Sequence, residues 1–104
     1  MTRPVPPAVT ADAYPALREF CRGYLHEDVA AEHGTAAAAA AAFLADATPE
    51  DREALRAEWR LFAAAIQKHT MAEVRAMLGG PLGARWLPAR RRQLEEITQA
   101  LTRR

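Results

Sequence analysis

The chain has few of the residues that form disulfides or fill a large hydrophobic core. It has a single cysteine, Cys21, so no disulfide can form within it, and a reducing compartment is the simpler setting. Aromatic residues make up only 7% of its 104 residues, and much of the apolar half is alanine. A chain of this length forms one domain, and this composition gives it a modest core.

Long apolar runs are also absent. The proline-rich start lacks the hydrophobic stretch of a signal peptide, and the alanine run over residues 36–42 is far shorter than the about 20 residues that span a bilayer. We therefore expect a soluble, cytoplasmic protein with no membrane partner. Residues 1–13 lack periodicity and are expected to form a flexible arm, followed by a single helical domain over residues 14–104.

No segment alternates polar and apolar residues with the period of a strand, and no glycine-rich phosphate loop is present. What the chain has instead is helical periodicity with clear start signals. Threonine caps or first-turn prolines stand at Pro15, Thr35, Thr48, Thr70 and Pro88. We predict an all-α bundle of about five helices over residues 15–28, 36–47, 49–69, 71–78 and 88–102. The first helix could end as early as residue 25, or continue irregularly to residue 33 before Gly34.

Apolar positions on the predicted helices define the expected core. In the third helix they recur at four-, three- and four-residue steps, at Leu55, Trp59, Phe62 and Ile66. Trp59 should therefore be central to the core. The first helix carries a similar stripe, formed by Leu17, Phe20, Cys21, Tyr24 and Leu25. Cys21 is thus expected to be a small buried hydrophobe and not a reactive thiol.

Two further expectations concern large apolar and aromatic residues. Phe43 and Leu44 are expected to anchor the alanine-rich second helix. Tyr24 and Trp86 are the candidates for exposed aromatic residues. Trp86, in the connector over residues 81–87, is expected to cover the core, the alternative being an anchor in an interface.

Potential metal ligands concentrate at the end of the first helix, in the set His26, Glu27, Asp28, Glu32 and His33. On a continuous helix, His26 and His33 would lie about 10 Å apart, so one ion could not bridge them. The two-histidine zinc spacing of i, i+4 is absent. We expect no metal here, and expect Asp28 to cap a helix or to pair with Arg22 or Arg18.

Catalytic patterns are absent from the sequence. No serine, histidine and acid occur in a recognisable local context, and the one thiol is expected to be buried. The sequence therefore predicts no enzyme activity, no cofactor and no small-molecule substrate.

Charge is unevenly distributed, although the net charge is only +1. Residues 27–58 hold eight acids against two arginines, whereas residues 59–104 hold nine bases against three acids. Opposite poles of this kind can steer and orient a charged partner. The alternative is that the two poles pair with each other across the bundle.

A basic run, Arg90-Arg91-Arg92, gives a second functional hypothesis: a small helical regulatory protein that binds nucleic acid through this face. Glu95 and Glu96 follow directly, however, and no helix-turn-helix pattern appears. A solvated helix face is therefore the simpler interpretation.

The first helix also carries a family resemblance. It reads Pro15-Ala16-Leu17-Arg18, then Phe20, then Gly23-Tyr24-Leu25-His26-Glu27-Asp28. This segment resembles the opening of a family of immunity proteins from bacterial contact-dependent growth inhibition systems, which begin with an aromatic-Pro-x-Leu helix and continue into a Gly-Tyr-x-His-x-Asp-like stretch. The Thr48-Pro49-Glu50 helix start and the Trp86-Leu87 pair are similar as well.

The resemblance implies that the protein binds and neutralises the C-terminal domain of a cell-surface toxin. If that toxin is a nuclease with a basic groove, the acidic region could block the groove by charge complementarity. The predicted partner-binding residues are Tyr24, His26, Glu27, Asp28, Glu50, Asp51 and Glu53.

Overall fold

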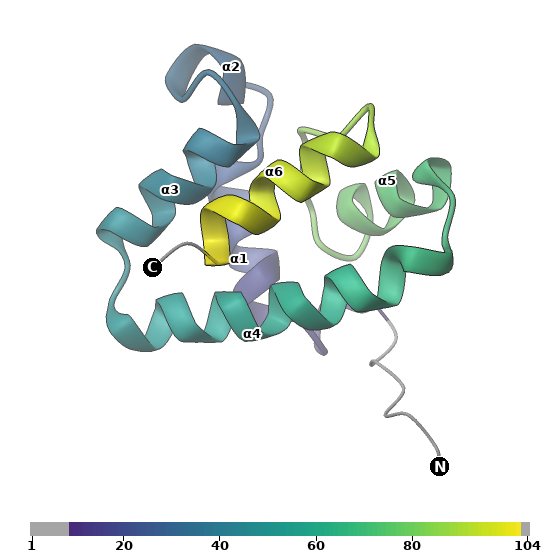
Figure 1. Ribbon diagram of the computed structural model, residues 1–104, viewed down its shortest axis with the longest axis horizontal. Coiled ribbons are helices and arrows are strands. Elements are labelled where there is room, and N and C mark those ends of the chain that lie inside the picture. Colours follow the sequence, from purple (N-terminus) through teal and green to yellow (C-terminus); the bar gives the residue numbers. More distant parts are fainter. Residues whose placement is uncertain (1–8, 103–104) are drawn as a thin grey trace.

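The computed structural model describes residues 9–102, and residues 1–8 and 103–104 lie outside the described range. The described chain is all α-helical and contains no strand, which confirms the predicted fold class (Figure 1). The helices are α1 (Pro15–Tyr24), α2 (Val29–Glu32), α3 (Ala36–Asp46), α4 (Pro49–Ala65), α5 (Met71–Gly79) and α6 (Arg91–Thr102), with a short 3₁₀ helix η1 (Ile66–Lys68) after α4.

Part of the predicted N-terminal arm lies within the described range. Residues 11–13 form a turn, in which the Ala13 N–H donates to Thr10 Oγ1 at 3.1 Å. Val9 and Ala13 pack against the core. The rest of the arm, residues 1–8, falls outside the described residues.

Threonine caps begin the three helices in the middle of the chain, as predicted. The hydroxyl oxygens of Thr35, Thr48 and Thr70 each accept a hydrogen bond from the backbone N–H three residues later, at 3.1–3.2 Å. At α5 the capping is reciprocal, because Glu73 Oε1 also accepts from the Thr70 N–H at 2.9 Å. These caps satisfy N–H groups that have no partner inside the helix.

The core forms where α4 meets α1 and α6. The four predicted apolar positions are buried, three of them on α4 and Ile66 on η1, and the Trp59 indole N–H donates to Thr98 Oγ1 of α6 at 2.8 Å. Cys21 is buried as well, and burial raises the pKa of its thiol to about 12. Cys21 is therefore the small core residue that the sequence predicts.

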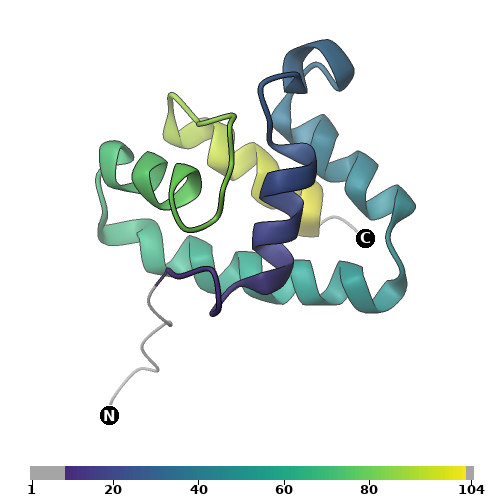
Figure 2. The same cartoon turned by 180° about the vertical axis from the view of Figure 1, so that it is seen from behind.

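Helix α1 crosses α4, as seen from behind in Figure 2, and depends on it for its start. Tyr14 stands at the N-cap position and gives no side-chain cap, whereas Glu58 Oε1 of α4 accepts from the Leu17 N–H at 2.9 Å. The Tyr14 ring is buried and meets Phe62 edge-on, with centroids 6.4 Å apart. Burial, and then the charge of Glu58, raise the pKa of Tyr14.

Helix α3 packs along α6, and its predicted anchors, Phe43 and Leu44, pack against the core from its second half. Its buried residues are Ala36, Ala39 and Ala40, whereas Phe43 and Leu44 are only half-buried. Small side chains let two helix backbones approach closely, so the alanines themselves form the contact surface. Phe43 instead lies edge-on to Phe20 of α1, with centroids 5.5 Å apart.

Several helix limits also differ from the prediction. Helix α1 ends at Tyr24, next to the earlier of its predicted ends, and the separate short helix α2 lies where an irregular continuation was the alternative. Helix α6 begins at Arg91, not at Pro88, because Gln93 Oε1 reaches back to accept from the N–H groups of Ala89 and Arg90 at 2.6 and 3.1 Å. Within residues 9–102, no helix is long and apolar enough to cross a bilayer.

Candidate functional site

The predicted partner-binding residues occupy two separate places. Tyr24, His26, Glu27 and Asp28 lie at the end of α1 and in the turn before α2, whereas Glu50, Asp51 and Glu53 lie in the first turns of α4. Helix α3, with 11 residues, stands between these places, a length of about 16 Å. Figure 1 shows α2 and the start of α4 at opposite ends of α3. The fold therefore does not bring the predicted residues into one cluster.

His26 orders the turn before α2, and His33 follows that helix. His26 Nδ1 accepts from the Asp28 N–H at 3.1 Å, and His26 Nε2 lies 3.5 Å from Glu32 Oε2. His33 Nε2 lies 3.7 Å from the same carboxylate oxygen. Because Nδ1 of His26 is an acceptor, a neutral ring carries its proton on Nε2, which faces Glu32.

Tyr24 belongs to an aromatic cluster and is only half-exposed. Its ring stacks on Phe20 at 5.9 Å and on His33 at 6.0 Å, and meets Phe43 edge-on at 5.4 Å. Trp86 is likewise half-buried and packs against the core, as expected for a residue that covers it. Neither ring is fully displayed for a partner.

The break between α1 and α2 changes the expected geometry of the histidines. His26 and His33 converge on Glu32, which they could not do on one continuous helix. No group of three or more His, Cys, Asp or Glu in residues 9–102 could hold a metal ion. Asp28 stands at the N-cap position of α2, but its carboxylate makes no cap hydrogen bond and no ion pair with a described arginine, contrary to expectation.

An open hollow of about 800 Å³ lies beside this turn. It is lined by Arg22 of α1, by His26, Glu27, Asp28 and Glu32, and by Gly79, Gly83, Ala84 and Arg85 from the end of α5 and the connector. The connector runs beside the end of α1 because the N–H groups of Arg85 and Trp86 both donate to the Leu25 carbonyl oxygen, at 2.8 and 3.1 Å (Figure 2). We call this surface the α1–connector hollow.

Gly83 lets the connector approach α1 this closely. Its φ of +71° is in the left-handed region, and a Cβ at this position would lie 3.0 Å from Arg22 Cγ. Sequence reasoning placed Arg22 near Asp28 as a possible ion-pair partner, but it missed Arg85 as a neighbour of the predicted residues. The glycines of residues 79–83 signal a bend in the sequence, but they do not indicate where the chain goes after the bend.

At the start of α4, Glu50, Asp51 and Glu53 are exposed. Glu53 Oε1 lies 3.7 Å from Arg60 NH2, while Glu50 and Asp51 form no ion pair with a described residue. The first-turn acids stabilise the helix through its dipole and remain available to a partner.

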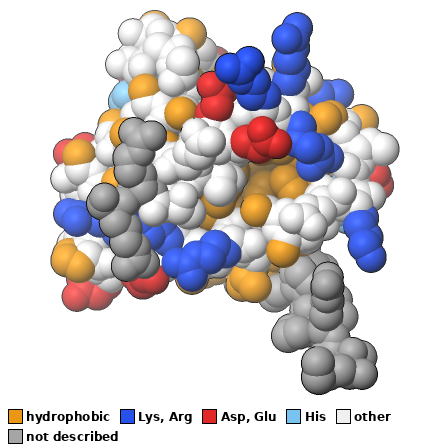
Figure 3. All heavy atoms as spheres, in the orientation of Figure 1, with side chains coloured by type: hydrophobic (Ala, Val, Ile, Leu, Met, Phe, Trp, Pro, Cys, Tyr) orange, Lys and Arg blue, Asp and Glu red, His pale blue; other side chains and the backbone are white. Residues whose placement is uncertain are grey.

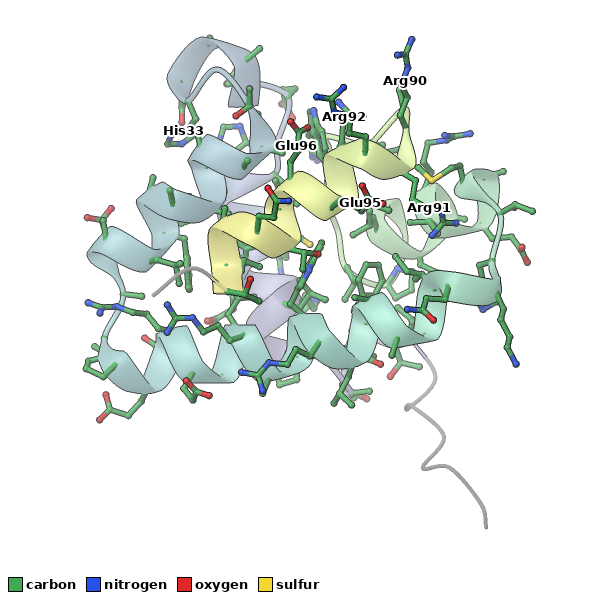
Figure 4. The ribbon with its side chains drawn as sticks, viewed as in Figure 1. His33, Arg90, Arg91, Arg92, Glu95 and Glu96 are labelled. Atoms are coloured by element: carbon green, nitrogen blue, oxygen red, sulfur yellow. The ribbon has the colours of Figure 1, made fainter. Side chains whose placement is uncertain are left out.

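The basic run at the start of α6 does not form one continuous face. Arg91 is half-buried and donates to the His69 carbonyl oxygen at 2.7 Å, at the end of the α4–η1 segment. Arg90 and Arg92 are exposed, and Figure 4 shows them pointing away from Arg91. Glu95 and Glu96 lie one turn further along the same helix.

A second, smaller depression lies between α4 and α6. Its volume is about 260 Å³, and its lining consists of Trp59, Ala63, Ile66, Gln67, Arg91, Leu94, Glu95 and Thr98. Figure 3 shows apolar side chains on the floor of this depression. Trp59 and Leu94 of this lining are core residues, so the depression lies over the core.

Comparison with known families decides between the two functional hypotheses. The family model described as CdiI immunity protein matches residues 13–101, from the residue before Tyr14 to the last turn of α6. The chain belongs to the CdiI immunity protein family. This result confirms the resemblance drawn from the first helix. No curated protein and no solved structure matches the chain.

Membership in the CdiI family gives the chain an immunity role in contact-dependent growth inhibition. The family is not a class of enzymes. The match extends over α1 to α6 and thus includes both groups of predicted binding residues as well as the α1–connector hollow.

Proposed function

We propose that this protein neutralises a contact-dependent growth inhibition toxin by binding the toxin's C-terminal domain in the cytoplasm. The observation that carries the proposal is the CdiI family match over residues 13–101. An immunity protein protects its own cell, so it must meet the toxin where the toxin acts. Direct binding to the toxic domain is the simplest means available to a small helical protein whose described residues form no recognisable reaction centre.

The chemistry of the described side chains supports stoichiometric binding. The thiol of Cys21 is buried, and its raised pKa keeps it protonated near neutral pH. Each of the three histidines lies within 3.4–3.7 Å of a glutamate that helps to order its own segment. These groups are committed to local structure, which leaves the charged exterior as the functional surface.

We further propose that both predicted groups of residues face the toxin. A protein–protein interface of standard size covers about 800 Å² of each partner, which is wide enough to include two patches separated by the length of α3. The acids at the start of α4 are exposed, so they can attract a basic surface of the toxin before contact. The segment from Tyr24 to Asp28 is held by stacking and hydrogen bonds, so it can present a fixed shape.

The alternative, nucleic-acid binding through Arg90–Arg92, has less support. Arg91 is engaged with the backbone at the end of η1, and Glu95 and Glu96 would repel phosphates near the two exposed arginines. Replacing all three arginines with alanine should therefore leave retention on a nucleic-acid column unchanged.

The deciding experiment is a binding measurement with the C-terminal domain of the toxin encoded beside this protein's gene. We expect the two to co-purify, to give one-to-one stoichiometry by calorimetry, and to restore growth when co-expressed with the toxin domain. A toxin domain from an unrelated system is the control. Absence of a complex at micromolar concentrations, together with unrestored growth, would contradict the proposal.

A further inference from the structure

We infer that the α1–connector hollow is the central docking site for the toxin domain, and that it takes a toxin surface carrying both basic and acidic side chains. The inference rests on the proposed function and assigns the surface that performs it. It adds Arg22, Arg85 and Leu87 to the contact residues and gives the acids of α4 a secondary role.

The frame of the hollow is rigid before any partner arrives. Two backbone N–H groups of the connector share the Leu25 carbonyl oxygen, and Ala84 N–H donates to the Leu78 carbonyl oxygen at 2.8 Å. Val29, which anchors α2, is 1% exposed. A surface held in this way loses little conformational entropy on binding, which favours affinity.

Charges of both signs line the hollow and are available. Arg22, Glu27, Asp28 and Arg85 are exposed, and they form no ion pair with another described residue. The arginines come from α1 and the connector, and the carboxylates come from the turn before α2. Phosphates would be repelled by the carboxylates, so the mixed lining suits a protein surface of complementary charges.

An exposed apolar residue borders the hollow. Leu87 is 40% exposed, and its side chain would lie 3.5 Å from a Cβ placed on Gly79, one of the lining residues. Interfaces combine an apolar centre with arginine and a polar rim, and a few such residues carry most of the binding energy. Leu87 beside Arg85 thus supplies an apolar contact next to the charged lining.

The test compares matched charge reversals in the complex with the cognate toxin domain. Arg85→Glu and Asp28→Lys alter the hollow, while Arg90→Glu and Glu19→Lys make the same changes at exposed positions outside it. We expect each hollow variant to raise the Kd about tenfold or more, chiefly through faster dissociation, and each control to change it less than about threefold. Circular dichroism should give the same spectrum for all four variants.

Hydrogen exchange on the wild-type complex gives an independent measurement that needs no variant. Amides in residues 22–32 and 79–87 should gain protection when the toxin domain binds. Protection confined to the start of α4 or to the depression between α4 and α6 would overturn the inference, as would hollow variants that bind like the wild type. If the wild-type protein forms no complex at all, the proposed function fails together with the docking site.

Discussion

Three arginines of the described chain cap the ends of helical segments. Arg52 Nε donates to the Ala47 carbonyl oxygen, Arg56 Nε to that of Leu101, and Arg91 NH2 to that of His69. Each contact places a cation at the end of a helical segment, where the helix dipole favours positive charge. The count of bases therefore overstates the charge that this protein can offer to a phosphate backbone.

Gly83 is the residue whose backbone conformation matters most to the α1–connector hollow. Gly83→Ala should lower the free energy of unfolding by about 2–3 kcal/mol, because a side chain at positive φ costs about 1–2 kcal/mol and the new methyl group also meets Arg22. Urea unfolding followed by circular dichroism measures this loss.

Two other glycines separate the backbone cost at positive φ from the cost of the contact with Arg22. Gly34 has a φ of +85° but open space around it, so Gly34→Ala should show the backbone cost alone, about 1–2 kcal/mol. Gly23 lies within α1 with nothing near it, so Gly23→Ala should stabilise the protein by about 0.5–1 kcal/mol. If Gly83→Ala and Gly34→Ala lower the free energy of unfolding equally, the contact with Arg22 contributes nothing to the loss.

Thr98 supplies the partner of the only hydrogen-bonding group on the central Trp59 ring. Thr98→Val keeps the side-chain shape but leaves the buried indole N–H without an acceptor, at a cost of about 1–3 kcal/mol. Thr102→Val is the matched control, since Thr102 is exposed and its hydroxyl bonds only to the backbone of its own helix. Thermal unfolding of both variants tests the difference, and similar melting temperatures would contradict this role of Thr98.

Among the elements, those whose limits depend on local chemistry could be predicted from the sequence. Helices α3, α4 and α5 begin at Thr35, Thr48 and Thr70 because each threonine caps its own helix. The end of α1 and the start of α6 depend instead on contacts between residues that are not local or on a long side chain. Backbone N–H groups of the connector donate to the Leu25 carbonyl oxygen, and the Gln93 side chain caps α6 from within the helix. No local pattern predicts contacts of that kind.

The capping box of α5 makes one element sensitive to pH. The Thr70 backbone N–H, and then the His69 side chain, lower the pKa of Glu73 from 4.5. The ionised carboxylate therefore stabilises the fold; its contribution is present above pH 4.5 and is lost as the pH falls through the lowered pKa. Glu73→Gln should be less stable than the wild type at pH 7, and the difference should shrink below pH 4.5. Urea unfolding at pH 7 and pH 3 measures this, and a difference independent of pH would contradict it.

At the scale of the whole molecule, the candidate site could be predicted only in part. The sequence indicates the segment from Tyr24 to Asp28, because a polar cluster follows an apolar stripe there. It does not indicate that Arg85, about 60 residues later, lies beside that segment, because this depends on the bend at Gly83 and on the Leu25 carbonyl. Of the ion pairs between described residues, that of Glu53 with Arg60 joins the two poles of charge, whereas Glu50 and Asp51 form none.

The exposed acids at the start of α4 should affect the rate at which the toxin is captured. Reversing the charges together at Glu50, Asp51 and Glu53 should slow association with the toxin domain by about tenfold at low salt, because long-range attraction to a basic surface is lost. The dissociation rate should change little, and the difference in association should fade as salt screens the charges.

Stopped-flow fluorescence at several ionic strengths measures these rates. Arg90→Glu combined with Arg92→Glu is the control: it reverses exposed charges at the start of α6, so association should keep its rate or become faster. This comparison separates the two proposed surfaces, because variants of the α1–connector hollow should act on dissociation. Unchanged association of the α4 variant at low salt would exclude the start of α4 as a steering surface and leave the hollow as the sole candidate.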